Sequence, residues 1–262
     1  LYASSQYNLN EDLQLYAGLR YVVFNALGPK DVYQYLSGSP KNGETINDSI
    51  NFTNGAVIKT YHGPEWRFSA RYTLNSTSSV KAGISRTRQY IHSLSNSASL
   101  SPTDTWRLSG YHLMPQSADQ VSLGYFKNLF RNTIEVSVEG YYKWMDNLVD
   151  FKTGADFLLN ENIERVALQG PGKSYGLEFS LNKSGRLNGW INYAYARTFI
   201  KLDGTAAEET VNEGQYFPTA YDKPHTINLV ANYKLTRRLS FSINSTYNTG
   251  RPVTVPVAGF NF

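Results

Sequence analysis

The stretch ALQGPGKSYG, from Ala167 to Gly176, contains GPGKS, which resembles the end of a phosphate-binding loop. A complete P-loop reads G-x-x-x-x-G-K-[ST] and runs from a strand into a helix, whose first backbone N–H groups bind the phosphates. Here Ala167 stands where the first glycine is required, and apolar residues alternate with polar ones from Tyr175 to Asn182. A period of two indicates a strand rather than a helix. The pattern therefore argues against a nucleotide site.

Two pairs of ionisable side chains have spacings that could serve an enzyme. Asp222 lies three residues before His225 and could orient it as a general base, but no nucleophile is placed beside them. Glu135 and Glu139 could act as paired carboxylates of a glycosidase. On one strand they would lie about 13 Å apart, beyond the separation that glycosidases use. We therefore predict no catalytic residues and no enzymatic activity.

The histidines, the missing cysteines and the charge argue against other kinds of site. His62, His92 and His112 are far apart in the sequence and lie in long loop-like segments, where solvated histidines are commoner than metal ligands. Cysteine is absent, which removes thiolate ligands and disulfides. The net charge is only +4, and Lys and Arg are scattered. The sequence thus predicts no metal, no cofactor and no nucleic-acid partner.

The elements that must position these residues are strands. Aromatic residues make up 14% of the chain. No segment approaches the roughly 18 consecutive apolar residues of a membrane helix, so a membrane role would have to use strands. Alternation of apolar and polar residues recurs along the chain and predicts about ten antiparallel strands. The alternating segments are residues 13–23, 66–74, 80–84, 121–125, 134–144, 174–182, 188–197, 227–235 and 239–243.

The lengths of the connections favour a transmembrane barrel over a soluble β-sandwich. Both architectures alternate apolar and polar residues, so alternation alone cannot separate them. Within each predicted hairpin only about three to five polar residues connect the strands. Between hairpins the connections are much longer: residues 25–63, 91–119, 150–173 and 200–222. Short periplasmic turns on one rim and long extracellular loops on the other are typical of outer-membrane barrels.

The polar side of the alternation would line a lumen, and aromatic residues near strand ends would form a girdle at the membrane surface. The predicted lumenal residues are Arg20, Arg67, Arg71, Lys81, Glu135, Glu139, Lys143, Glu178, Asn228, Lys234 and Asn244. The predicted girdle residues are Trp66, Tyr142, Trp144, Tyr193, Tyr195, Tyr233 and Tyr247. So polar a lumen needs water or a plug, and barrels of about 22 strands hold a plug. Residues 1–262 are therefore expected to be part of one larger transmembrane barrel domain.

Several runs resemble the barrel strands of TonB-dependent outer-membrane receptors of the Bacteroidota type. Residues 172–198 (GKSYGLEFSLNKSGRLNGWINYAYART) and 216–256 (YFPTAYDKPHTINLVANYKLTRRLSFSINSTYNTGRPVTVP) look like later strands of that barrel. Residues 66–96 and 115–128 are similar to earlier strands, and the resemblance covers nearly the whole chain. It implies that GPGKS lies where an extracellular loop re-enters the barrel.

The resemblance also implies a location, a function and partners. It places the chain in the bacterial outer membrane, as a receptor for TonB-dependent uptake of a scarce, bulky solute such as a metal chelate, a glycan or a peptide. The implied partners are outer-membrane lipid, the remainder of the barrel and its plug, the TonB complex acting through that plug, and a surface lipoprotein. The plug, its TonB-binding segment and the final strands are not found in these residues.

One long loop carries the densest set of side chains that could hold a polar solute. Aromatic area with a few convergent polar groups is what such a site needs, and loops on a rigid scaffold commonly supply it. The predicted ligand-binding residues, all within residues 91–119, are His92, Trp106, Arg107, Tyr111 and His112. Two other classes stay open: an outer-membrane enzyme or a ten-stranded barrel acting alone, and a soluble surface-binding β-domain.

Overall fold

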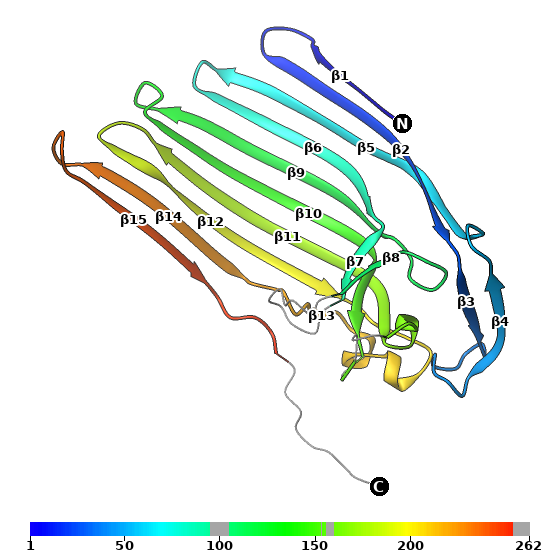
Figure 1. Ribbon diagram of the computed structural model, residues 1–262. Coiled ribbons are helices and arrows are strands. Elements are labelled where there is room, and N and C mark those ends of the chain that lie inside the picture. The colour runs from blue at the N-terminus through cyan, green and yellow to red at the C-terminus, as the bar shows by residue number, and fades with distance from the viewer. Residues whose placement is uncertain (95–104, 153, 156–159, 254–262) are drawn as a thin grey trace.

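A computed structural model describes residues 1–94, 105–152, 154–155 and 160–253 of the chain. Ten long strands form one antiparallel sheet in which each strand pairs with the next long strand along the chain (Figure 1). The long strands are β1 (Tyr2–Asn8), β2 (Leu13–Leu27), β5 (Val57–Asn75), β6 (Ser78–Gln89), β9 (Gln116–Leu129), β10 (Ile134–Phe151), β11 (Ala167–Lys183), β12 (Leu187–Ile200), β14 (His225–Lys234) and β15 (Ser240–Asn248). The predicted all-β antiparallel fold is therefore confirmed.

Strand β1 is the long strand to which the sequence assigned no range. Its residues read YASSQYN, so the apolar positions that would mark alternation are mostly small or polar. It forms because β2 offers it an edge: Tyr2 through Asn8 pair in continuous register with Arg20 through Gln14. Strand β15 forms the opposite edge of the sheet. Because β1 and β15 do not pair with each other in the described sheet, the barrel is not closed within this chain.

The two ends of the sheet differ in the way the alternation of connection lengths predicts. The connections β1–β2, β5–β6, β9–β10, β11–β12 and β14–β15 are short and all lie at one end (Figure 1). The segments between hairpins gather at the other end. We call these segments, residues 28–56, 90–115, 152–166 and 201–224 as far as the structure describes them, the cap. The short connections thus mark one rim and the cap marks the other.

The predicted long loops contain local structure. The first holds a hairpin of β3 (Lys30–Tyr35) and β4 (Ile46–Phe52), and the second holds paired β7 (Ile91–Leu94) and β8 (Thr105–Leu108). The third contains one 3₁₀ turn, η1 (Ile163–Arg165). The fourth contains two, η2 (Ala207–Glu209) and η3 (Asn212–Gly214), and also β13 (Phe217–Pro218), which pairs with β12. None of the described helical turns has the length and apolar character needed to cross a membrane.

The stretch GPGKS lies inside β11 and not at the predicted junction between loop and strand. The register between β10 and β11 shifts between Met145 and Leu148, which places a bulge opposite Pro171. Proline has no N–H to donate to a ladder, and a bulge is where a sheet tolerates it. At Gly170 a Cβ atom would collide with the Lys201 carbonyl oxygen. These residues therefore let the cap approach the strand closely, and the absence of a following helix confirms that GPGKS is no P-loop.

The register separates the sheet into an apolar outer face and a polar inner face. On the outer face, Phe68 pairs with Ile84 and Ile84 pairs with Val121, and these side chains are 44%, 49% and 40% exposed. So continuous an apolar surface is unfavourable in water, whereas it is favourable in contact with lipid hydrocarbon. On the inner face, Arg71 pairs with Lys81 and Glu139 with Glu178. The predicted assignment of polar residues to the lumen thus matches the register.

Part of the predicted aromatic girdle forms a contiguous row on the outer face. The ring centroids of Tyr142 and Trp144 lie 4.6 Å apart, Tyr142 stacks with Tyr175 at 6.1 Å, and Tyr175 stacks with Phe199 at 6.3 Å. Lys173 Nζ lies 4.3 Å from the centroid of the Tyr216 ring. Rings with a polar tip beside a cation suit the boundary between hydrocarbon and headgroups.

Buried apolar side chains are concentrated at the cap end of the ten-stranded sheet and not along the rest of the sheet. One cluster contains Leu94, Ala155 and Ile163, and another contains Leu148, Leu168, Ile200 and Leu202. Burial of such side chains contributes about 1.5–3 kcal/mol each. Described parts of the cap therefore pack against one another and against the ends of β10, β11 and β12.

Candidate functional site

Four of the five predicted ligand-binding residues meet around one hollow in the cap. Trp106, Arg107, Tyr111 and His112 line a cavity of about 540 Å³, together with residues from the ends of β2 and β5 and from the segment before β11. Cavities of about 300–1,000 Å³ suit small to medium ligands. The sequence grouped these residues because they are neighbours along the chain, and the structure brings them to one place.

His92 does not line this hollow. Its side chain is only 1% exposed, and its Nε2 lies 2.9 Å from the Ser109 hydroxyl oxygen. Burial lowers the pKa of His92, so the neutral ring is favoured. This residue therefore joins β7 to the segment after β8, and we leave it out of the candidate site.

Trp106 and Arg107 lie next to each other on β8 but are held differently. The Trp106 ring is 58% exposed and offers a broad apolar surface to the hollow. The Arg107 side chain is partly buried, and its Nη2 donates a hydrogen bond of 2.7 Å to the Asn160 carbonyl oxygen. That bond fixes the guanidinium, which retains other N–H donors for a ligand. The pair thus combines a stacking surface with an oriented cation.

Tyr111 and His112 form another part of the lining. Their rings meet edge to face with centroids 4.9 Å apart, and Lys59 Nζ lies 5.9 Å from the Tyr111 centroid. His112 Nε2 lies 2.7 Å from the Tyr33 carbonyl oxygen and must donate to it. Burial lowers the pKa of His112, although the bond to Tyr33 acts in the other direction. A neutral His112 with Nε2 protonated leaves Nδ1 as an acceptor.

The sequence did not identify the other polar residues of the hollow. Lys30, Asn25, Glu161 and Glu164 come from three different segments of the chain. The signal that could have found the first two is their position at the outer ends of strands, where loops held by a scaffold commonly bind ligands. Their combination with Arg107 gives the hollow both charge signs, which suits a solute with several polar groups.

A second, smaller hollow of about 200 Å³ adjoins the first. His112, Leu113 and Glu164 line both of them. Glu164 is 7% exposed, and its Oε1 accepts a hydrogen bond of 3.2 Å from the Tyr35 hydroxyl. His112 and Glu164 therefore lie where the two hollows meet.

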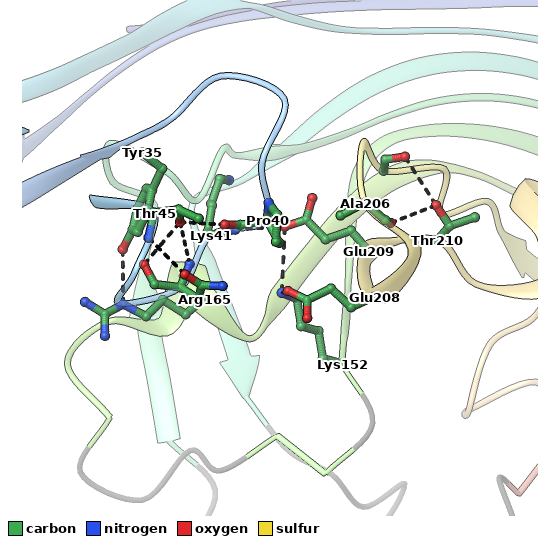
Figure 2. A network of polar contacts seen from close by, with 12 residues as sticks. Tyr35, Pro40, Lys41, Thr45, Lys152, Arg165, Ala206, Glu208, Glu209 and Thr210 are labelled. Atoms are coloured by element: carbon green, nitrogen blue, oxygen red, sulfur yellow. Dashed lines mark hydrogen bonds and ion pairs between the residues drawn. The ribbon is translucent and has the colours of Figure 1, made fainter. Parts of the chain in front are cut away.

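Three cap segments meet at an ion-pair network around Lys152 (Figure 2). Lys152 Nζ lies 2.8 Å from Glu208 Oε1 and 3.7 Å from Glu209 Oε1. Glu209 Oε1 also accepts a hydrogen bond of 3.3 Å from the backbone N–H of Lys41. The connection between β3 and β4, the segment after β10 and η2 are therefore joined at one point.

A second set of contacts in the same view joins the β3–β4 hairpin to η1 (Figure 2). Arg165 Nε donates a hydrogen bond of 3.2 Å to the Tyr35 hydroxyl oxygen. The Arg165 guanidinium also lies over the Tyr33 ring, 5.6 Å from its centroid. These contacts join the β3–β4 hairpin to the segment that contains Ile163 and Glu164, two residues that line the hollow.

The enzyme-like pairs considered from the sequence have other partners. Asp222 Oδ2 accepts a hydrogen bond of 2.9 Å from Arg197 Nε, and Asp222 Oδ1 accepts one of 2.7 Å from the Thr198 backbone N–H. His225 Nδ1 instead lies 2.9 Å from the Tyr193 hydroxyl oxygen. Asp222 and His225 therefore each bind residues of β12 and do not form a hydrogen bond with each other. Among the described residues, no three His, Asp or Glu side chains gather as a metal site would require.

The chain matches the family model described as "TonB dependent receptor-like, beta-barrel" over residues 1–260. No curated protein sequence matches it. Its similarity to solved structures is one of fold, because sequence identities are low.

Three solved structures illustrate that similarity. The ferric-catecholate import receptor Fiu from Escherichia coli K12 is 16% identical with a TM-score of 0.57, and the match covers 94% of this chain and 33% of that one. The FrpB iron transporter from Neisseria meningitidis is 12% identical with a TM-score of 0.55, covering 90% and 30%. The ferripyoverdine receptor from Pseudomonas aeruginosa is 14% identical with a TM-score of 0.55, covering 94% and 30%. The chain therefore spans about one third of the length of these proteins.

Proposed function

The chain belongs to the family of TonB-dependent receptor-like β-barrels, and we propose from this premise that its receptor takes up a scarce, bulky solute with energy supplied through TonB. Members of this family lie in the outer membrane of Gram-negative bacteria and are transporters rather than enzymes. The predicted outer-membrane location and the absence of enzymatic activity agree with that membership. The Bacteroidota origin stays a prediction.

One observation carries the proposal. The cap contains a hollow of about 540 Å³ at the long-loop rim, and the sheet has a polar inner face. A solute caught at that rim would meet polar side chains all the way to the short-turn rim. This arrangement suits capture followed by passage through a polar lumen.

The proposed ligand-binding residues are Trp106, Arg107, Tyr111 and His112. A metal chelate, a glycan or a peptide would each use a stacking ring beside oriented donors and acceptors, so these side chains fit all three classes. The solved structures of similar fold are named as iron or copper transporters, and a metal chelate is therefore the first solute to test. This residue set is a proposal from geometry alone.

Lipid and the rest of the barrel are proposed as partners from the exposed surfaces of the sheet, and the plug, the TonB complex and a lipoprotein are proposed from the family. Outer-membrane lipid covers the apolar outer face, and further strands of the barrel pair with the free edges of β1 and β15. A plug fills the polar lumen and links it to the TonB complex, and a surface lipoprotein contacts the cap. Each of these partners is part of the proposal.

The alternatives make different demands on the same residues. A ten-stranded barrel acting alone would need β1 to pair with β15, and these are the two edges of the described sheet. A soluble domain would need to hide Phe68, Ile84 and Val121, which are exposed. Expressed alone, residues 1–262 should neither refold in detergent as a heat-modifiable monomer nor remain soluble without it.

The test is energy-dependent uptake by the full-length receptor. Cells that express it should accumulate an iron chelate, a glycan or a peptide in the presence of TonB and lose that uptake when TonB is deleted. Binding of the same solute to the cell surface should persist in both strains, because capture precedes energy coupling. Uptake that is unchanged without TonB would refute the proposed mechanism.

A further inference from the structure

Glu164 is a buried carboxylate that lines the hollow of the candidate site and also the smaller hollow beside it. Its Oε1 accepts a hydrogen bond from the Tyr35 hydroxyl, and the described residues give the carboxylate no other hydrogen bond. None of their cations lies within ion-pair distance of it. A buried carboxylate without a cationic partner is costly. This position therefore favours a ligand that brings positive charge.

Three cations surround Glu164 without pairing with it. Arg165 Nε donates its hydrogen bond to the Tyr35 hydroxyl oxygen instead (Figure 2). Lys30 lines the first hollow and Lys41 lines the second, and both lie beyond ion-pair distance from the carboxylate. Tyr35 therefore orients one oxygen of Glu164, and the carboxylate keeps capacity to accept hydrogen bonds from a ligand.

Aromatic rings lie near this carboxylate. His112 lines both hollows with Glu164, and its ring lies 5.5 Å from the Tyr35 centroid and 4.9 Å from the Tyr111 centroid. Lys59 Nζ lies 5.9 Å from the Tyr111 centroid, so an ammonium group already accompanies one of these rings. Aromatic rings attract ammonium groups, most strongly where water is excluded. Rings beside a buried carboxylate thus suit an organic ammonium group.

Positive charge is also available in the same hollow. Arg107 and Lys30 line it, and neither has a carboxylate within ion-pair distance in the part of the chain that the structure describes. Arg107 is oriented by its bond to the Asn160 carbonyl oxygen, and a guanidinium group matches the geometry of a carboxylate. The lining also contains the aliphatic side chains Leu27, Val32 and Ile58. The hollow therefore suits a solute with an ammonium group, a carboxylate and apolar side chains.

We propose that this solute is a short peptide, whose terminal ammonium group binds Glu164 and whose terminal carboxylate binds Arg107. The inference rests on the proposed function and deepens it, because it assumes that the receptor captures its solute in the cap hollow. A neutral glycan has neither charged group. A chelate that presents only neutral or anionic groups would leave Glu164 without a cation. A peptide has both groups and joins them through a backbone that carries apolar side chains.

The experiment measures binding of tripeptides to the purified full-length receptor in detergent. A pool of tripeptides built from Ala, Ser, Leu and Tyr carries charge only at the two ends, and each peptide spans at most about 10–11 Å. The same pool is prepared with the amino end acetylated and, separately, with the carboxyl end amidated. Equilibrium dialysis with mass spectrometry gives the Kd of each peptide in the three pools.

We expect acetylation and amidation each to weaken binding to the parent receptor about 10- to 100-fold, because each removes a charge-assisted hydrogen bond. In Glu164→Gln the effect of acetylation should disappear, and in Arg107→Gln the effect of amidation should disappear. The matched control is Glu161→Gln, since Glu161 lines the same hollow but is exposed to water. This control should respond to both modifications as the parent does. Heat-modifiability on gels shows that each variant is assembled.

The comparison of the three pools on the parent receptor tests the inference even if a variant fails to assemble. Equal binding of the free and acetylated pools, or of the free and amidated pools, would overturn it. Absence of binding by every tripeptide would overturn it too. None of these measurements involves TonB. TonB-dependent uptake of an iron chelate or a glycan would therefore uphold the proposed function even where the peptide inference fails.

Discussion

Leu229 lies on the outer face of β14, and replacing it with arginine tests which face of the sheet meets lipid. It pairs with Ile191 on β12 and Ser245 on β15, whereas its neighbour Asn228 faces the lumen and pairs with Asn192 and Thr246. The two positions are adjacent in the chain, so they share depth in the membrane. Only the direction of the side chain differs.

The depth of Leu229 sets the size of the effect. Strand β14 has 10 residues. At about 3.4 Å per residue and a tilt of about 45°, a strand of that length rises about 24 Å, which is close to the height of the apolar band. Leu229 is near the middle of β14 and therefore near the bilayer midplane. Arginine there should cost about 2–4 kcal/mol, or about 30- to 1,000-fold in the folding equilibrium.

The matched control is Asn228→Arg. It keeps the new charge in the polar lumen and loses one hydrogen bond, in which Thr246 Oγ1 donates to Asn228 Oδ1 at 3.0 Å. The loss of such a bond costs about 1 kcal/mol. Both variants should be made in the full-length receptor, refolded into phospholipid vesicles and unfolded with guanidinium. Equal destabilisation by Leu229→Arg and Asn228→Arg would show that the assignment of the two faces is wrong.

Three further outcomes are expected. An epitope tag within residues 75–79 should be hidden in intact cells, and one within residues 37–54 should be accessible. The reason is that the short turns and the cap lie at opposite rims. Surface labelling of the tag within residues 75–79 would show that the topology is inverted. Replacing Trp106 and Tyr111 with Ala should lower solute binding while heat-modifiable assembly persists, and unchanged binding would remove the hollow from the site. Burial lowers the pKa of His92, so the unfolded state binds the proton more readily, and the stability that neutral His92 contributes is present above about pH 6.5 and falls at lower pH. The protection of the β7 amides against hydrogen exchange, corrected for the pH dependence of the intrinsic exchange rate, should therefore fall on acidification in the parent but not in His92→Gln. An equal fall in both proteins would exclude this histidine as the cause.

Alternation and connection length were enough to predict the antiparallel sheet and its two rims. Each long strand repeats an apolar and a polar position, and a period of two survives in the sequence whatever the strand packs against. The lengths of the connections can likewise be read from the sequence, so the short connections and the long ones could be placed at different rims without coordinates. The exception is β1, because Ser4, Ser5 and Gln6 give no alternation and the strand forms only through the edge that β2 provides.

The cap and the site depended on tertiary structure. The sequence placed His92 with Trp106 and Tyr111 because they are near one another in the chain, but the fold buries His92 against Ser109 and leaves the other two at the hollow. Glu164 reaches the hollow from a segment far along the chain, and no local pattern records that approach. The same holds for GPGKS, because Gly170 is needed where the Lys201 backbone, just after β12, comes close to β11. Strand period is a local property of the backbone, whereas burial and the meeting of distant loops arise only when the segments pack together.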